Sequence, residues 1–129
     1  MTTAYWCIFI AAMLPYLWIG IGKSAAKGYD NRDPRGWLAK QTHPRVQRGN
    51  AAHLNAFEAF APFAASVLMA QAAGVDPAKI TTLTVVFIVC RVLHGVFYLS
   101  NTHALRSLAW AVGIGCVAAL MVQAALKVI

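Results

Sequence analysis

Charged side chains are scarce in this sequence. Lys, Arg, Asp and Glu make up 12% of its 129 residues, whereas soluble proteins average about 25%. Hydrophobic residues make up 60% of the chain, which is more apolar surface than one soluble core of this length can hide. These proportions argue against an ordinary soluble domain. At about 20 residues for each crossing of a bilayer, the chain has room for four membrane spans joined by short links.

Cysteine pairs are also lacking. The three cysteines, Cys7, Cys90 and Cys116, all fall in apolar stretches and show no CxxC or Cys/His ligand spacing. This pattern argues against a disulfide framework and against a metal site, so we expect the three cysteines to be packing residues.

The first 22 residues have no basic start and no convincing cleavage site before Lys23. We therefore expect this segment to be retained as the first span and not removed as a signal peptide.

The apolar stretches predict one all-α integral membrane domain over residues 1–129. We expect a four-helix bundle of up-down-up-down antiparallel topology, because the second and third links are short. Trp6, Trp18 and Trp37 fall near predicted span ends, where indole rings favour the lipid–water interface. The predicted helices cover about residues 4–22, 50–75, 80–99 and 105–128, with a polar loop at 23–48.

The basic residues are unevenly distributed. Seven of the eleven Lys and Arg residues lie in the loop at 23–48, and the positive-inside rule places such a loop in the cytoplasm. Both chain termini are then expected outside. The net charge of +7 is explained by this topology and by anionic lipid headgroups. We expect no nucleic-acid partner, because no basic helix or aromatic strand pattern exists outside the predicted spans.

Polar residues interrupt the third predicted span. Arg91, His94 and Tyr98 are spaced i, i+3 and i+7 and therefore share one helical face. A charged side chain within a span costs about 2.5–3.5 kcal/mol on insertion scales, so it usually faces a protein interior or a water-filled cavity. The default interpretation is a polar site inside a helical membrane protein.

The neighbouring spans carry polar residues at the same expected depth. Asn55 and Glu58 lie near the start of the second helix, and Arg106 and Ser107 open the fourth. With the loop in the cytoplasm, all of these groups fall at the cytoplasmic side of the membrane. Glu58 is the single acid within a predicted span. It is expected to meet Arg91, Arg106 or a cationic ligand group, because an unpaired buried carboxylate is costly.

Two interpretations of this cluster compete. In the first, Glu58, Arg91 and Asn55 form a buried network that sets the helix register, while Arg106 and Tyr98 reach toward the headgroups. In the second, a cationic, hydrogen-bonding pocket binds a charged, water-soluble molecule, and the apolar helix faces admit a lipophilic one. Several arginines with a carboxylate and an amide exceed what setting the register requires, so we favour the second interpretation.

Two segments resemble a known family. The stretch RVQRGNAAHLNAFEAFAPF, from Arg45 to Phe63, is similar to the second-helix signature of the MAPEG family, the membrane-associated proteins in eicosanoid and glutathione metabolism. That signature is an arginine followed by N-x-x-E and then by proline or an aromatic residue. The run RVLHGVFYL and the following LRSLAW resemble the same family's R-x-x-H-x-x-x-Y and R-S motifs. The resemblance covers nearly the whole chain and is nearest to a bacterial-type member.

The resemblance implies a homotrimer that binds glutathione as a co-substrate between subunits near the cytoplasmic face of a bacterial inner membrane. It implies a transferase or peroxidase acting on a lipophilic electrophile, with Arg106 stabilising the glutathione thiolate and Ser107 donating a hydrogen bond to the sulfur. Glu58 suits the tripeptide's amine and the arginines suit its carboxylates. The implied glutathione-contacting set is Asn55, Glu58, Arg91, His94, Tyr98 and Arg106.

Two positions depart from the family pattern. Leu54 stands where eicosanoid-forming relatives have an arginine, and Trp110 stands where some relatives have a tyrosine. Each change removes a polar contact. The family also includes a lipid-binding member without catalysis. The resemblance therefore leaves open a non-catalytic trimer that binds lipid or a partner helix.

Overall fold

The computed structural model describes residues 1–128, and within them all regular secondary structure is helical. The all-α class predicted from the sequence is confirmed. Five helices follow one another along the chain: α1 (Thr2–Lys23), α2 (Pro34–Ala39), α3 (Pro44–Ala72), α4 (Pro77–Leu99) and α5 (His103–Lys127).

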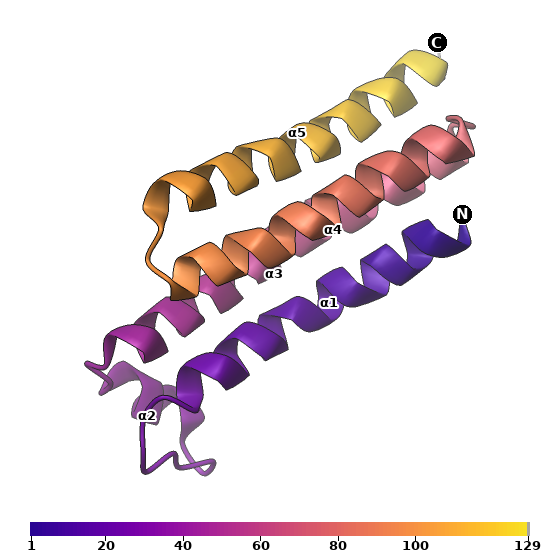
Figure 1. Ribbon diagram of the computed structural model, residues 1–129. Coiled ribbons are helices and arrows are strands. Elements are labelled where there is room, and N and C mark those ends of the chain that lie inside the picture. The colour runs from indigo at the N-terminus through magenta and orange to yellow at the C-terminus, as the bar shows by residue number, and fades with distance from the viewer. Residues whose placement is uncertain (129) are drawn as a thin grey trace.

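The four long helices lie side by side and alternate in direction (Figure 1). The short helix α2 lies at the end where α1 finishes and α3 begins, and the N-terminus and the end of α5 lie at the opposite end. Both α3 and α4 pack against all three other long helices, whereas α1 and α5 pack mainly against these two. The bundle therefore has α3 and α4 in its middle, with α1 and α5 on either side.

The structure differs from the predicted ranges around the first connection. The range 23–48, predicted as a loop, contains α2 and the first turn of α3, which begins at Pro44 and not near residue 50. Both starts are capped. The Asp33 carboxylate accepts a hydrogen bond from the Gly36 N–H at 2.9 Å, and the His43 ring accepts one from the Arg45 N–H at 3.2 Å. A proline follows each cap at the first helical position, where its missing N–H costs nothing.

The connection between α1 and α3 has contacts of its own. The Lys23 ammonium donates to the Tyr29 hydroxyl at 3.0 Å, and the Tyr29 ring meets the Trp37 ring edge-on at 5.2 Å. Arg32 donates two side-chain hydrogen bonds of 3.0 Å to the Asp30 carboxylate, and this guanidinium lowers the pKa of Asp30 below its ordinary value. Both partners of this pair are solvent-exposed, so we assign it little stabilising energy.

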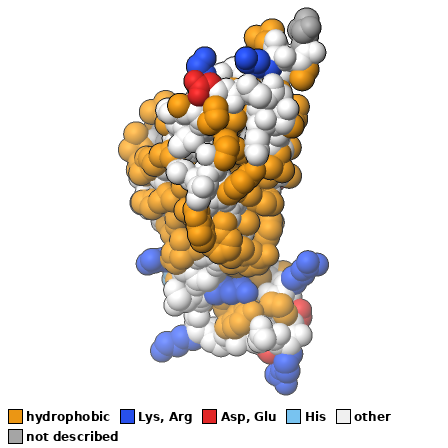
Figure 2. All heavy atoms as spheres, turned by 90° about the vertical axis from the view of Figure 1, so that its right-hand side faces the viewer, with side chains coloured by type: hydrophobic (Ala, Val, Ile, Leu, Met, Phe, Trp, Pro, Cys, Tyr) orange, Lys and Arg blue, Asp and Glu red, His pale blue; other side chains and the backbone are white. Residues whose placement is uncertain are grey.

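Three helices, α1, α4 and α5, are long and apolar enough to cross a membrane. Four apolar spans were predicted, and α3 is the one that does not qualify. Its 29 residues are sufficient in length, but its first half carries Arg45, Arg48, Asn55 and Glu58. The central position of α3 explains how it tolerates these groups, because packing against three helices leaves it less surface for lipid. A belt of hydrophobic side chains separates basic groups at the two ends of the molecule (Figure 2).

The helices approach closely at glycines near the α2 end. A Cβ added to Gly49 on α3 would lie 2.6 Å from the Gly22 Cα on α1, so these helices meet backbone to backbone. On α4, a Cβ added to Gly95 would lie 2.2 Å from the Trp18 indole ring. Trp18 is accordingly buried, with 4% of its surface exposed. The expectation that Trp18 lies at the lipid interface was wrong. Gly95 has no side chain and so leaves space for the Trp18 ring between the helices.

The other half of the bundle is held by an apolar core. The Phe63 ring on α3 and the Phe87 ring on α4 stack with centroids 3.8 Å apart and planes within 7°. Ala4 and Cys7 of α1 and Leu120 of α5 belong to the same buried cluster. This packing fixes α3 against α4, and the polar residues of both helices lie closer to the α2 end.

Candidate functional site

A cavity of about 190 Å³ opens toward the α2 end of the bundle. Its walls come from the three helices α3, α4 and α5. The lining residues are Asn55, His94, Tyr98, Arg106, Ser107 and Trp110. Five of these six were predicted site residues, so the structure brings residues that are far apart in the sequence into one cavity.

Helical spacing explains how each wall forms. His94 and Tyr98 are one turn apart on α4, and their rings meet edge-on with centroids 5.4 Å apart. Arg106 and Trp110 are likewise one turn apart on α5. The short link at residues 100–102 joins the two helices and brings these faces together. The two walls are therefore set by local geometry and one tight connection.

Arg106 provides the cationic group of the cavity. Its guanidinium carbon lies 4.4 Å from the centroid of the Tyr98 ring, which is a cation–π arrangement. Within residues 1–128, the one ion pair joins Arg32 to Asp30 in the connection, so no acid neutralises Arg106. A half-buried cation without a counter-ion is well suited to attract an anionic ligand group.

His94 has a buried nitrogen without a hydrogen-bond partner. The residue is 3% exposed, and its Nδ1 is the single buried side-chain polar atom left unsatisfied within the described residues. Leaving such an atom unpaired costs about 1–3 kcal/mol. Almost none of this atom's surface is accessible, so a ligand in the cavity could pair with it only if the surrounding side chains moved.

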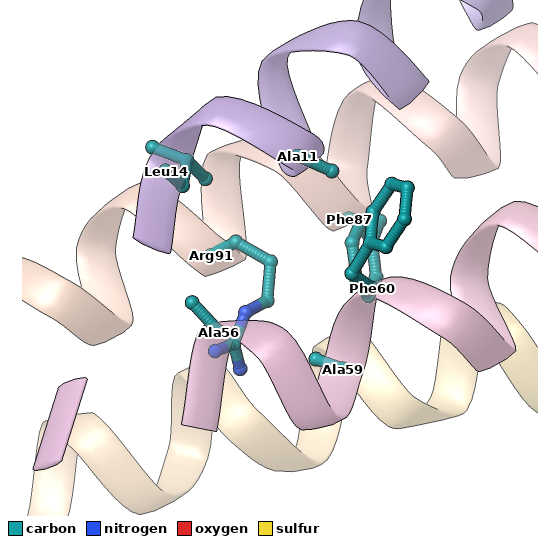
Figure 3. A pocket seen from close by; sticks show the side chains of 7 residues that line it. All are labelled: Ala11, Leu14, Ala56, Ala59, Phe60, Phe87 and Arg91. Carbon is teal, nitrogen blue, oxygen red and sulfur yellow. The ribbon is translucent and has the colours of Figure 1, made fainter. Parts of the chain in front are cut away.

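Arg91 does not line the cavity. Its side chain is 4% exposed and extends from α4 toward Ala56 on α3, in a pocket that Ala59 and Leu14 also line (Figure 3). Its Nη2 donates a hydrogen bond of 2.8 Å to the Asn55 Oδ1. Arg91 therefore orients the Asn55 amide from behind, and Asn55 is the member of the pair that reaches the cavity.

Glu58 is not brought into the cavity either. It is exposed on α3, and its Oε2 accepts a long hydrogen bond of 3.4 Å from the Asn55 Nδ2. The predicted pairing of Glu58 with Arg91 or Arg106 was wrong for this chain, since neither guanidinium lies within ion-pair distance in the described part. Arg91 is directed into the bundle, whereas Glu58 lies on its outer surface. The predicted alternative, a cationic ligand group, stays a prediction.

Two further residues have a role near the site. Trp110, which stands where some relatives have a tyrosine, contributes to the cavity wall with 48% of its surface exposed. Arg48, which we had counted among the loop cations, donates to the Leu99 carbonyl at 3.2 Å. That carbonyl lies in the last turn of α4, where backbone acceptors lack helical partners. Arg48 thereby ties the start of α3 to the end of α4.

Metal ligands are not grouped in the described residues. Within residues 1–128, no cluster of three or more His, Cys, Asp or Glu side chains is close enough to hold a metal ion. Cys7, Cys90 and Cys116 are free thiols buried among the helices. The side chains that line the cavity carry guanidinium, imidazole, amide, phenol, hydroxyl and indole groups.

Three apolar helices that can cross a bilayer, with a polar cavity between α3, α4 and α5, define a helical integral membrane protein. The model of one protein family, described as the MAPEG family, matches residues 3–126 of the chain. The chain therefore belongs to the MAPEG family, which includes glutathione transferases and peroxidases. No curated protein and no solved structure matches the chain.

Proposed function

We propose that this chain is a membrane-bound glutathione-dependent transferase or peroxidase that acts on a lipophilic electrophile. The observation that carries the proposal is the cavity that gathers His94, Arg106 and Ser107 beside the apolar helix faces. Membership of the MAPEG family supports it, because that family includes such enzymes. The distribution of Lys and Arg supports a cytoplasmic location for the α2 end, and we propose a bacterial inner membrane as the location of the protein.

The charged groups of glutathione match the charged residues in and near the cavity. Glutathione carries two carboxylates and one amine, so it requires cationic and acidic partners together. Arg106 supplies an unpaired guanidinium in the cavity, and Glu58 supplies an exposed carboxylate beyond it. Arg91 acts through the Asn55 amide that it orients. The proposed glutathione-binding set is Asn55, Glu58, Arg91, His94, Tyr98 and Arg106.

The proposed chemistry needs a thiolate. The Arg106 cation and the Ser107 hydroxyl favour the ionised sulfur and lower the thiol pKa of bound glutathione from its free value of about 8.5. In a transferase reaction the thiolate forms a carbon–sulfur bond with the electrophile as the leaving group departs. In a peroxidase reaction two glutathione thiols are oxidised to a disulfide, and a lipid hydroperoxide is reduced to its alcohol and water.

The open shape of the cavity supports assembly into a homotrimer. Its volume of about 190 Å³ lies below the roughly 300–1,000 Å³ of complete small-molecule sites. Glu58 lies outside it on the bundle surface, next to Leu54, which is 52% exposed. A neighbouring copy of the chain covering this face would complete the walls and bring Glu58 to the ligand. We propose that glutathione binds between such neighbours.

The proposal is tested by glutathione binding and by conjugation of 1-chloro-2,4-dinitrobenzene, in which the sulfur displaces chloride. We expect purified protein to bind glutathione and to show thiolate absorbance at neutral pH. Arg106→Ala should reduce turnover by about 10²–10³-fold, as removal of one preorganised charge-stabilising donor does in other enzymes. Glu58→Ala should weaken glutathione binding and leave the thiol pKa of the bound tripeptide unchanged.

Arg35→Ala is the matched control, because Arg35 is an exposed arginine of the connection. It should retain both binding and turnover. Parent protein that fails to bind glutathione would contradict the enzymatic proposal. If glutathione binds and its thiol titration is the same in Arg106→Ala, the role assigned to Arg106 is wrong although the binding site is right.

One observation favours a second function. Arg91 is nearly fully buried and hydrogen-bonded to Asn55, as expected of residues that set the register of two membrane helices. Leu54 also presents an apolar side chain where eicosanoid-forming relatives have an arginine. A non-catalytic trimer that binds lipid or a partner helix would use these features without turnover. Retention of lipid by parent protein that neither binds nor conjugates glutathione would favour this alternative.

A further inference from the structure

A second hollow lies at the end of the bundle opposite to the cavity. It has a volume of about 230 Å³ and lies between the first turn of α4 and the last turns of α5. Its lining residues are Val75, Lys79, Gln123, Leu126 and Lys127. The hollow therefore combines two ammonium groups and an amide with two apolar side chains.

The hollow contains the two lysines of the chain that lie away from the α2 end. Of the eleven Lys and Arg residues, seven lie in the range 23–48, and Arg91 and Arg106 lie toward the same end. The two that remain, Lys79 and Lys127, come from different helices and line the same hollow. The ion pair of the described residues is elsewhere, between Arg32 and Asp30. Both ammonium groups are thus available to a ligand.

One acid lies nearby. Asp76 precedes α4, and its Oδ1 accepts a hydrogen bond of 2.8 Å from the Ala78 N–H as the cap of that helix. The other three acids of the chain, Asp30, Asp33 and Glu58, lie in other parts of the sequence. Asp76 is not among the residues that line the hollow, and its carboxylate is engaged in capping, so the hollow keeps an excess of positive charge.

Membrane topology does not account for these lysines. The positive-inside bias collects cations at the α2 end and requires none at the opposite end. Lys79 is the third residue of α4 and Lys127 is the last residue of α5. Both therefore lie where apolar helices end and lipid headgroups begin. Figure 2 shows basic groups beyond the hydrophobic belt at this end as well.

We propose that this hollow binds the phosphate of an anionic phospholipid headgroup between Lys79 and Lys127. The ammonium groups donate charge-assisted hydrogen bonds to the phosphate oxygens. Val75 and Leu126, the latter 68% exposed, offer an apolar wall to the glycerol and upper acyl carbons. Gln123, one turn before Lys127, lies on the wall between the charged and apolar parts, with its Nε2 donating to the Ala119 carbonyl at 3.2 Å.

The test compares lipids bound to the purified chain by native mass spectrometry, with equal amounts of phosphatidylglycerol and phosphatidylcholine. We expect an excess of bound phosphatidylglycerol. Each lysine near an anionic lipid surface is worth about fivefold in binding at modest salt. Lys79→Gln with Lys127→Gln should therefore reduce the excess by about an order of magnitude or more. The double Arg variant, Lys79→Arg with Lys127→Arg, should retain it.

The matched control is Lys27→Gln with Lys40→Gln, which removes two exposed lysines from the connection. This control should keep the excess of phosphatidylglycerol. Equal losses in the two Gln pairs would overturn the proposal, because the effect would then be one of net charge. Inorganic phosphate at millimolar concentration is the third arm. If it displaces the lipid at equal occupancy, the hollow is a site for free phosphate and the lipid proposal is wrong.

Discussion

The guanidinium group of Arg91 shows how a single residue can be tolerated inside a membrane helix. It lies beside Ala56 on α3 (Figure 3) and donates to the Asn55 Oδ1 at 2.8 Å. The alanine leaves room for the long side chain, and the amide satisfies a donor that lipid could not satisfy. The same bond holds Asn55 toward the cavity. Packing and binding are thus joined in one pair of residues.

We predict that Asn55→Leu destabilises the chain by about 1–3 kcal/mol, because it leaves a buried donor of Arg91 unpaired. Thermal unfolding in detergent would measure the loss. Asn55→Leu combined with Arg91→Leu should recover most of it, since replacing both partners with apolar groups can be nearly neutral. If the double variant is no more stable than the single one, the bond is not what makes Asn55 important for stability.

Sequence reasoning predicted much of the cavity at this scale. Helical spacing and chain direction were sufficient to expect Asn55, His94, Tyr98 and Arg106 at one depth, because both are local properties. Glu58 was harder. It is three residues from Asn55 and was expected to turn inward, yet it lies on the exposed side of α3. Spacing limits two residues to neighbouring directions of a helix, and packing decides which direction faces the interior.

At the scale of elements, the pair α1 and α3 is joined by glycine. Gly22 and Gly49 bring the two backbones into contact near the α2 end, where the connection and α2 also lie. Close approach of backbones increases van der Waals contact, which contributes strongly to helix association in lipid. The crossing therefore fixes the position of α3, and with it the position of Asn55.

We predict that Gly49→Ala destabilises the chain by about 1–3 kcal/mol. Its Cβ would meet the Gly22 Cα at 2.6 Å and the Trp18 carbonyl oxygen at 2.9 Å, and backbone atoms cannot move aside as flexible side chains can. Gly20→Ala is the control, because nothing lies within 4 Å of its added Cβ. It should be neutral or stabilising, since alanine favours the helix over glycine. Unfolding curves for both variants compare these expectations.

The element boundaries were predicted less well than the elements themselves. Asp33-Pro34 and His43-Pro44 lie in the range predicted as a loop, and each instead begins a helix in the structure. A proline after a capping residue fits both a turn and a first helical position, so local sequence alone does not separate them. The apolar character of α3 was likewise overestimated, because its polar half is tolerated through packing that the sequence does not display.

At the scale of the whole molecule, the proposed orientation has a direct test. The native cysteines are buried, so a membrane-impermeant maleimide should react only with a cysteine introduced at an exposed position. In intact cells we expect Lys127→Cys to be labelled and Lys27→Cys to be labelled only after permeabilisation. The reverse pattern would place the α2 end outside and overturn the proposed topology.

The proposed assembly has its own measurement. Light scattering of the purified protein, corrected for bound detergent, should give three times the chain mass of 13.9 kDa. Glu58→Gln should keep this mass and weaken glutathione binding, because the substitution preserves shape and removes charge. A parent protein with the mass of one chain would contradict the trimer. A variant that dissociates would show that Glu58 serves assembly and not the ligand.

The middle position of α3 has a consequence for how the protein is made. During translation α1 and α3 emerge before α4 and α5. The least hydrophobic of the long helices, α3, therefore enters the membrane before two of the three helices that it packs against have been made. Its early companion is α1, which offers Gly22 to Gly49 and the Pro15 carbonyl to the His53 ring nitrogen at 2.8 Å. The α1–α3 pair would thus form first and stabilise α3 in the membrane until α4 and α5 are made.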